Sequence, residues 1–145
     1  MILSKATAYG IRALVYLANH SDSTLCSLQE IAESEQIPPV YLRKLLGELR
    51  RHRLLRSVKG IHGGYELLRA PQSITLWEVF RVLEPDPYLD SCILACGVCQ
   101  SPNSCALHED WQQWRQSLLA LLQKKTIAEL ASSKRSYQTV EIAEI

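Results

Sequence analysis

The sequence predicts a mainly α-helical protein with a small β-hairpin wing, that is, a winged helix-turn-helix domain followed by a long C-terminal helix. Three observations predict this fold class. A short capped helix is followed, after a tight turn, by a helix rich in arginine and lysine; a hairpin with a glycine-rich turn comes next; and an apolar stripe marks a long helix toward the C-terminus. Because the chain has 145 residues, we expect one compact body with an appendage.

The first two helices are indicated by their caps and by the spacing of apolar residues. Ser4 can cap a helix that extends to about residue 19, and apolar side chains cover most of its circumference, so we expect it to pack on several sides. Ser27 and Glu30 form a capping-box pattern, which predicts a short helix that ends near residue 33 or 34. Cys26, just before this box, is expected to be a small packed apolar residue.

The third helix and the wing follow directly. Pro38 and Pro39 open the helix, since proline at the first helical positions loses no needed donor, and the helix runs to about His52. Apolar residues recur along it at helical spacing: Val40, Leu42, Leu45, Leu46 and Leu49. Residues 54–58 and 65–68 indicate two strands, joined by a turn at 59–64 that needs unusual backbone angles. In such an arrangement the basic helix can lie in a DNA major groove while the wing approaches a phosphate or a groove.

Charge is unevenly distributed along the chain. The formal net charge is only +1, but residues 43–59 carry seven basic side chains against the single acid Glu48, whereas residues 76–145 carry nine acids against six bases. A basic run alone is more typical of a solvated helix face; together with the proline-started helix and the glycine-rich wing it indicates DNA binding. The contact candidates are Tyr41, Arg43, Lys44 and Arg51 in the helix and Arg56, Lys59, Gly60 and His62 in the wing.

The C-terminal half contains two further helices. Residues 73–75 precede a helix over 76–83, residues 84–87 break it, and a long helix is expected from about Ala106 to Lys125. The stripe of this long helix is wide and aromatic: Trp111, Trp114, Leu118, Leu121 and Leu122. So much apolar surface outside a small winged domain is best explained by pairing with a second copy in a homodimer. We therefore expect a DNA-binding domain (1–83), a cysteine-rich loop (84–105), a dimerisation helix (106–131) and a flexible tail (132–145).

Four of the five cysteines and one histidine gather between residues 92 and 108. We expect a cytoplasmic chain, because the start of the sequence lacks the features of a signal peptide and no stretch is apolar enough to span a membrane. In that reducing environment an odd number of cysteines, most of them clustered, argues against a disulfide framework and for metal or redox chemistry. The spacing is Cys92-x6-Cys99-x5-Cys105-x2-His108, with Cys96 as an additional thiol. Soft donors at this spacing suit an iron-sulfur cluster or zinc.

Other interpretations of this cluster stay open. Cys96-Gly-Val-Cys99 is a C-x2-C knuckle, which suits zinc. Two of the cysteines can instead form a disulfide in a cluster-free thiol switch. Incidental thiols are the least favoured explanation, because four cysteines in one loop have little packing rationale.

Three segments resemble the winged-helix regulators of the IscR- and NsrR-like family, also called Rrf-two or Rrf2. They are LSKATAYGIRALVYLA, IPPVYLRKLLGELRRHRLLRSVKGIHGGYEL and SITLWEVFRVLE, and the resemblance covers residue 1 to about residue 83. It implies a homodimer that binds palindromic double-stranded DNA. It also implies an iron-sulfur cluster, expected to be [2Fe-2S], held by Cys92, Cys99 and Cys105.

The fourth ligand of this implied cluster is open. Some relatives use a carboxylate near the start of the first helix, but residues 5–8 contain no acid here. His108 follows the third cysteine at the spacing found in relatives with a histidine ligand. Cys96 competes with it, because a thiolate is the commoner ligand. We favour His108.

These observations together predict a homodimeric DNA-binding transcription regulator that senses iron, redox state or a small reactive molecule through an iron-sulfur cluster. The alternative is a regulator that uses zinc or free thiols, and an iron-sulfur electron carrier or metalloenzyme is less favoured. The sequence contains no glycine-rich phosphate loop, no H-E-x-x-H motif and no nucleophile with a recognisable base. No residue is therefore expected to be catalytic.

Overall fold

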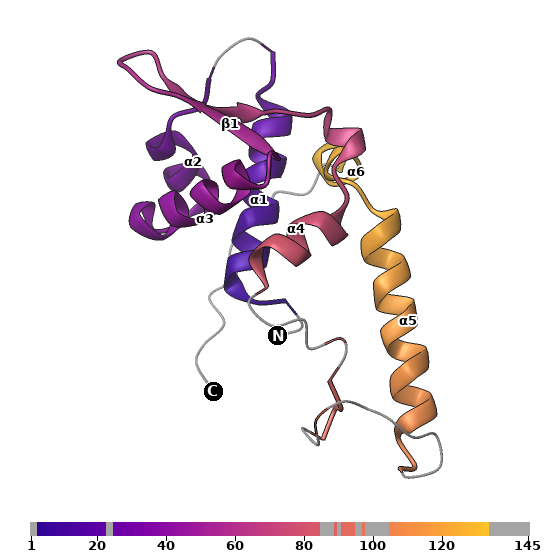
Figure 1. Cartoon of the computed structure of the whole chain (residues 1–145). Coiled ribbons are helices and arrows are strands. Elements are labelled where there is room, and N and C mark those ends of the chain that lie inside the picture. The colour runs from indigo at the N-terminus through magenta and orange to yellow at the C-terminus, as the bar shows by residue number, and fades with distance from the viewer. Residues whose placement is uncertain are drawn as a thin grey trace.

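The computed structural model describes residues 3–22, 25–84, 89, 91–94, 97 and 105–133, so that Cys96, Cys99 and residues 134–145 of the expected tail lie outside it. The predicted class, mainly helical with a two-stranded wing, is confirmed (Figure 1). The elements follow one another as α1 (Lys5–Asn19), α2 (Leu28–Glu35), α3 (Pro39–Arg51), β1 (Leu55–Val58), β2 (Gly64–Leu67), the 3-10 turn η1 (Pro71–Ser73), α4 (Leu76–Leu83), α5 (His108–Lys124) and α6 (Ile127–Ser132).

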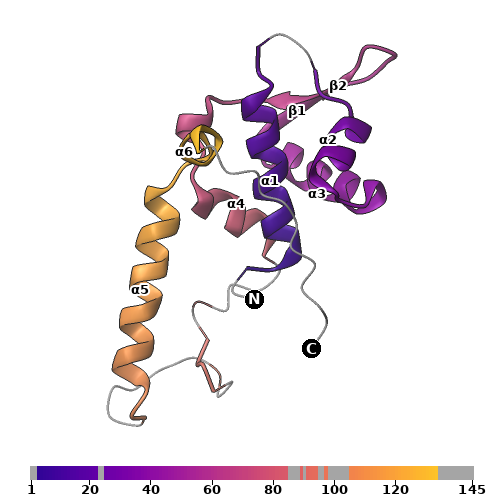
Figure 2. The same cartoon turned by 180° about the vertical axis from the view of Figure 1, so that it is seen from behind.

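Helix α1 is the centre of the body, and α2, α3, α4 and α6 pack around it (Figures 1 and 2). Ser4 caps it, because the Thr7 amide donates to Ser4 Oγ at 3.2 Å. Gly10 lets α4 cross closely, because a Cβ at this position would clash with Leu83 Cδ1. The prediction that this helix packs on several sides is confirmed by its fully buried residues Ala13 and Leu14 and its nearly buried Val15 and Leu17.

Helices α2 and α3 form the helix-turn-helix. Ser27 and Glu30 complete the predicted capping box, and Gln36 ends α2 in the left-handed conformation with a φ of 52°. The Ile37 amide then donates to the Ala32 carbonyl at 3.0 Å, which closes the turn between the helices. The second helix is anchored by the side chains that it buries in the core, Leu42, Leu45, Leu46 and Leu49.

The wing is the antiparallel hairpin of β1 and β2, in which Leu55 faces Leu67 and Val58 faces Gly64. A third segment joins the hairpin at its base. Cys26 and Tyr65 exchange backbone hydrogen bonds of 3.0 and 2.8 Å, so the segment before α2 pairs with β2 as a short bridge. This pairing fixes the wing relative to the helix-turn-helix.

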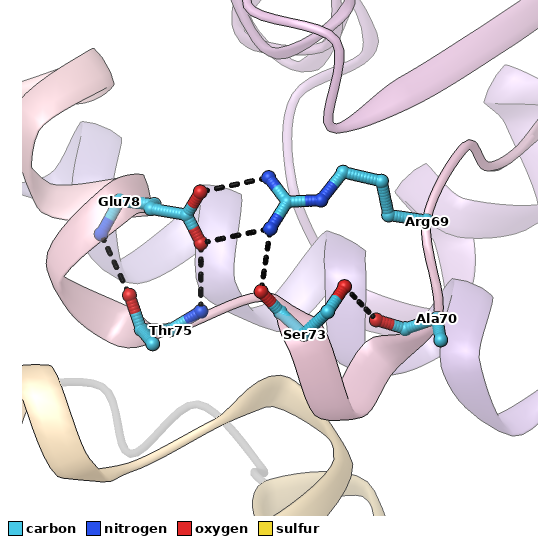
Figure 3. A network of polar contacts seen from close by, with 5 residues as sticks. All are labelled: Arg69, Ala70, Ser73, Thr75 and Glu78. Carbon is cyan, nitrogen blue, oxygen red and sulfur yellow. Dashed lines mark hydrogen bonds and ion pairs between the residues drawn. The ribbon is translucent and has the colours of Figure 1, made fainter.

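A polar network joins the end of the wing to α4 (Figure 3). Arg69 Nη1 donates to Glu78 Oε1 at 2.7 Å, and Arg69 Nη2 donates to the Ser73 carbonyl at 2.6 Å. The Thr75 amide donates to Glu78 Oε2 at 3.1 Å, as half of a capping box. Burial acts to raise the pKa of Glu78, but the hydrogen bonds from Arg69 and Thr75 outweigh it and the pKa is lowered.

Helix α5 leaves the body as an arm that points away from the wing tip (Figures 1 and 2). It begins at His108, two residues later than expected, and ends at Lys124, where a second helix, α6, follows after a break. The break has a local cause, because Thr126 and Glu129 form a capping box that starts α6. The segment 106–131, expected as one dimerisation helix, is thus an arm followed by a short docked helix. Every helix in the described ranges is too short or too polar to span a lipid bilayer.

The apolar stripe of α5 divides between two environments. Leu122 is buried with Phe80 and Leu89, and Leu118 packs against this small cluster. Trp114 and Leu121, by contrast, are 37% and 50% exposed. The expectation of a single stripe facing a partner is therefore corrected, because Leu118 and Leu122 are turned toward the chain's own α4.

Candidate nucleic-acid interface and cysteine segment

The exposed face of α3 lies opposite its four buried leucines. Since successive helical residues are rotated by roughly 100°, one sector away from the core holds the side chains that we name the basic face of α3: Val40, Arg43, Lys44, Gly47 and Arg51. Arg43 and Lys44 are exposed, and none of the carboxylates in the described ranges lies within ion-pair distance of either. Val40, which the apolar spacing grouped with the leucines, is 86% exposed. This face can therefore approach a polyanion without first breaking a contact of Arg43 or Lys44.

Two of the predicted arginine contacts are paired within the chain. Arg51 forms an ion pair with Glu48 one turn away on α3, and Arg56 forms one with Glu66 across the wing. The hydrogen bond from Arg51 holds the pKa of Glu48 below its ordinary value, so this carboxylate stays charged. Binding of a phosphate by Arg51 or Arg56 must compete with these carboxylates, whereas Arg43 and Lys44 form no ion pair with a carboxylate of the described residues, although the charge of Lys44 also acts on Glu48.

The tip of the wing presents the other predicted contacts. Lys59, Gly60 and His62 are exposed, and Gly60 has a φ of +117°, a conformation that L side chains rarely adopt. The Gly63 amide closes the turn by donating to the Gly60 carbonyl at 3.0 Å. Lys59 has no carboxylate within ion-pair distance in the part of the chain that the structure describes. The wing thus carries an unpaired cation next to an accessible backbone.

Tyr41 has a packing role that the sequence did not reveal. Its ring meets Tyr9 of α1 edge to face, with ring centroids 6.0 Å apart, and the guanidinium of Arg12 lies 5.6 Å from the Tyr9 centroid. Arg12 in turn pairs with Glu35 of α2 at 3.1 Å in a largely buried ion pair. Tyr41 therefore helps to set the position of α3 on α1, and its predicted contact with DNA stays a prediction.

Ser91, inside the cysteine-rich loop, and Cys105, at the end of that loop, both lie at the start of α5. Trp111 Nε1 donates to the Ser91 carbonyl at 3.0 Å, which brings the residue before Cys92 against the first turns of the helix. The His108 amide donates to the Cys105 carbonyl at 3.1 Å, so Cys105 lies just before the helix and His108 begins it. Three of the predicted ligands, Cys92, Cys105 and His108, thus belong to one end of the arm.

Cys92 takes part in two hydrogen bonds of the backbone. The Leu94 amide donates to Cys92 Sγ at 3.4 Å, and the Cys92 amide donates to the Gly97 carbonyl at 2.8 Å. Amides that donate to sulfur stabilise a thiolate. Among the described residues, however, no group of three or more histidine, cysteine or acidic side chains is arranged to hold a metal ion. The candidate ligands Cys96 and Cys99 lie outside the described residues, so the ligand set stays a prediction.

Glu84 fixes the start of the cysteine-rich loop to the beginning of α1. Its Oε1 accepts hydrogen bonds from the Ser4 amide at 2.8 Å and from Thr7 Oγ1 at 2.6 Å, and Thr7 is fully buried. Sequence reasoning missed this contact, which joins residues about eighty positions apart. The signal was a threonine on the side of α1 that faces the core, among apolar residues.

Cys26 is separate from this region. It is 6% exposed and packs in the main core, and burial, followed by the charge of Glu30, raises the pKa of its thiol. The expectation that Cys26 is a small packed apolar residue is confirmed.

Comparison with known proteins places this geometry among regulators. The model of the Rrf2 family, described as an iron-dependent transcriptional regulator, matches residues 3–133. The HTH-type transcriptional regulator IscR of Sodalis glossinidius is 30% identical over 141 residues, which cover 97% of this chain and 85% of that protein. The oxidized form of Staphylococcus aureus CymR superposes with a TM-score of 0.75 at 29% identity, covering 94% of this chain and 100% of that one. IscR of T. potens superposes with a TM-score of 0.71 at 28% identity, covering 93% of each chain.

Proposed function

This chain belongs to the Rrf2 family of transcription regulators, and from that premise we propose that it binds palindromic DNA as a homodimer and senses iron, redox state or a small reactive molecule through an iron-sulfur cluster. The observation that carries the DNA-binding part is the basic face of α3 beside the wing, with Arg43, Lys44 and Lys59 exposed and unpaired among the described residues.

In the proposed complex, α3 lies in the major groove and the wing lies against the backbone or the adjacent groove. Arg43 can donate two hydrogen bonds to guanine O6 and N7, which specifies a base, whereas Lys44 and Lys59 mainly neutralise phosphates. Tyr41, Arg51, Arg56, Gly60 and His62 complete the proposed contact set. Each protomer of a homodimer presents one α3 helix, so the two protomers would read the two halves of a palindrome.

A binding titration on duplex DNA tests this proposal. Arg43→Ala combined with Lys44→Ala should weaken binding at least tenfold, because it removes a base contact worth roughly 1 to 3 kcal/mol and a phosphate contact. The matched control is Lys124→Ala, an exposed lysine at the end of α5 that is far from α3 in the fold. If the double variant and the control bind DNA with equal affinity, the basic face of α3 is not part of the DNA interface.

The exposed strip of α5 supports the homodimer. Leu107, Trp114 and Leu121 recur every seven residues and are 45%, 37% and 50% exposed. A seven-residue apolar repeat is the pattern by which one helix packs along another. We propose that a second copy covers this strip.

Cys92, Cys99 and Cys105 are the proposed cluster ligands, with His108 as the fourth and Cys96 as its alternative. The donor chemistry fits, because the soft thiolates suit iron and the Leu94 amide already donates to Cys92 Sγ. A [2Fe-2S] cluster supplies a one-electron redox centre when it is bound. The chain itself restrains the loop at two points: Glu84 is hydrogen-bonded to Ser4 and Thr7 at the start of α1, and Ser91 accepts a hydrogen bond from Trp111 of α5.

Spectroscopy and metal analysis of anaerobically purified protein test the cluster. Cys92→Ala or Cys105→Ala should abolish the visible absorption together with the bound iron and sulfide. His108→Cys should keep a cluster at a lower reduction potential, since thiolate is negative and imidazole neutral, and Cys96→Ala should change little. If Cys96→Ala bleaches the protein while His108→Ala leaves its spectrum and potential unchanged, the fourth ligand is Cys96. If every such preparation contains zinc and no iron, the site binds zinc and the proposal of a cluster is wrong.

A cluster-free thiol regulator is the second candidate, and the likeness to the oxidized form of CymR favours it. Under this alternative, iron-free protein should lose two titratable thiols on mild oxidation and change its DNA affinity at the same time. Iron-free protein whose DNA affinity is the same in both oxidation states would exclude it.

A further inference from the structure

Val40 occupies an unusual place for an aliphatic side chain. It lies in the first turn of α3 and is 86% exposed, although Leu42, two residues later, is fully buried. Other large apolar residues that are strongly exposed in the described ranges belong to the wing, the segment after it, the cysteine-rich loop or α5; they include Val58, Ile61, Leu68, Ile93, Leu94 and Leu121. Within α3, Val40 is therefore the large apolar side chain that the fold leaves in solvent.

The neighbours of Val40 show which way it faces. Arg43 and Lys44 follow it by three and four residues, so these two exposed cations flank it on the helix surface. A Cβ added at Gly47, one further turn along, would meet no atom within 4 Å, so the surface beyond Val40 is open. Whatever approaches the two cations must also cover Val40.

We propose that Val40 is a specificity-determining residue that contacts the 5-methyl group of a thymine in the major groove. This inference rests on the proposed DNA-binding function and deepens it. The N-terminal residues of a recognition helix are those that reach base edges, and Val40 lies in that first turn. Arg43 and Lys44 supply the charge that brings the groove to it.

The chemistry of the side chain selects the base. Thymine is the base that presents a methyl group in the major groove, and an isopropyl group can bury that methyl but can form no hydrogen bond with the donors or acceptors of other bases. A β-branched side chain in a helix is also held close to one rotamer, so the contact costs little conformational entropy. Val40 thus favours thymine by apolar contact and leaves the polar groups of other bases unpaired.

Removal of single methyl groups from DNA tests this proposal. A preferred site is first selected with the full-length protein from a library of random duplexes, and each thymine of that site is then replaced in turn by deoxyuridine, which lacks only the methyl group. For the wild-type protein, each half-site should contain one thymine at which a single replacement weakens binding about fourfold, the factor that corresponds to one buried methyl group.

Val40→Ala should bind the thymine site more weakly than the wild type and should be indifferent to that deoxyuridine. The matched control is Ile61→Ala at the wing tip, which removes another exposed aliphatic side chain and should keep the full sensitivity to deoxyuridine. Thermal unfolding should be nearly the same for both variants, because both side chains are solvent-exposed.

The outcomes separate this inference from the function on which it rests. If the library yields no enriched sequence, the proposed sequence-specific binding fails. If a site is enriched but the wild type tolerates deoxyuridine at every thymine, or Val40→Ala keeps the wild-type sensitivity, the DNA-binding function stands and the assignment of Val40 is wrong.

Discussion

At the scale of single residues, Glu78 provides a pH-dependent contribution to stability. Arg69 and Thr75 hold its pKa below the ordinary value against the opposing effect of burial, so the folded state binds this proton more weakly than the unfolded chain does. The stabilisation is fully present above the ordinary glutamate pKa of about 4.3 and is lost as the pH falls through the lower folded-state value. The stability difference between the wild type and Glu78→Gln, measured by urea unfolding, should therefore shrink in acid.

The guanidinium of Arg69 identifies the source of this effect. In an Arg69→Met background, Glu78→Gln should change stability with a much weaker dependence on pH, because the principal hydrogen-bond donor to Glu78 is gone. If the stability difference between the wild type and Glu78→Gln stays constant from neutral to acid pH, Glu78 does not make the stability dependent on pH.

A single substitution at Gly47 should increase the stability of the protein and decrease its affinity for DNA. It lies inside α3, where glycine costs roughly 0.5 to 1 kcal/mol relative to alanine, and an added Cβ would meet nothing within 4 Å. Gly47→Ala should therefore raise the melting temperature while it weakens DNA binding, because the new methyl group lies on the basic face of α3. The control is Ser117→Ala on the exposed side of α5, which should leave DNA affinity unchanged. Unchanged affinity in Gly47→Ala would mean that DNA does not come close to the middle of α3.

At the scale of elements, caps and periodicity predicted most of the fold because they are local. Ser4, the Ser27–Glu30 box and the proline pair placed the first three helices nearly where the structure has them. The end of α5 at Lys124 also lies within one residue of the expected Lys125, but the separate helix α6 was missed although it has the same kind of signal, the box of Thr126 and Glu129.

Spacing alone could not say which partner an apolar side chain meets. Val40 and the leucines of α3 share helical spacing, yet they differ by about half a turn in direction. Likewise, Leu121 and Leu122 are adjacent, but one is half exposed and the other packs on Phe80. Such differences depend on tertiary contacts between elements distant in sequence, which a periodic pattern does not contain.

The proposed dimer is best tested at Leu121. Leu118 is a poorer choice, because it packs against the chain's own α4 cluster and its loss would also destabilise the protomer. Leu121→Asp should place a charge in the proposed interface and yield monomers in sedimentation experiments, with little change in the helix content of each chain. The control is Gln123→Asp, which adds the same charge on an exposed position of another side of α5. A Leu121→Asp protein that still sediments as a dimer would place the interface elsewhere.

At the scale of the whole molecule, the basic elements and the described candidate ligands Cys92, Cys105 and His108 lie at different ends. The basic face and the wing occupy one side of the body, and α5 carries Cys105 and His108 at its far tip, followed by Glu109 and Asp110 in its first turn (Figure 1). The net charge near zero conceals this separation. The position of the basic elements was predictable from local charge and turn residues, whereas the ties of the cysteine-rich loop to α1 and α5 depend on contacts such as Glu84 to Thr7.

This concentration of charge should make DNA binding strongly dependent on salt. Each neutralised phosphate contributes a slope of about −0.9 in a plot of log affinity against log salt. Lys59→Ala should reduce the magnitude of that slope by about this amount for each wing that contacts DNA, whereas Lys124→Ala, on α5, should leave it unchanged. Identical slopes for the wild type and Lys59→Ala would exclude the wing lysine from phosphate binding.

Among the described residues, helix α5 is fixed to the body at one end only, so it can act as a rigid lever arm. Its C-terminal end is clamped to the body, because the Leu76 amide donates to the Lys125 carbonyl and the Ile127 amide donates to the Ile74 carbonyl, each at 2.9 Å. A helix of 17 residues extends about 25 Å at 1.5 Å per residue. A tilt of α5 by about 5° around this attachment therefore moves its N-terminal end, with Cys105 and His108, by roughly 2 Å. Conversely, a displacement of roughly 2 Å at that end tilts α5 by only about 5°. This small rotation is transmitted to α4, which contacts α5 and also packs against α1 and α3.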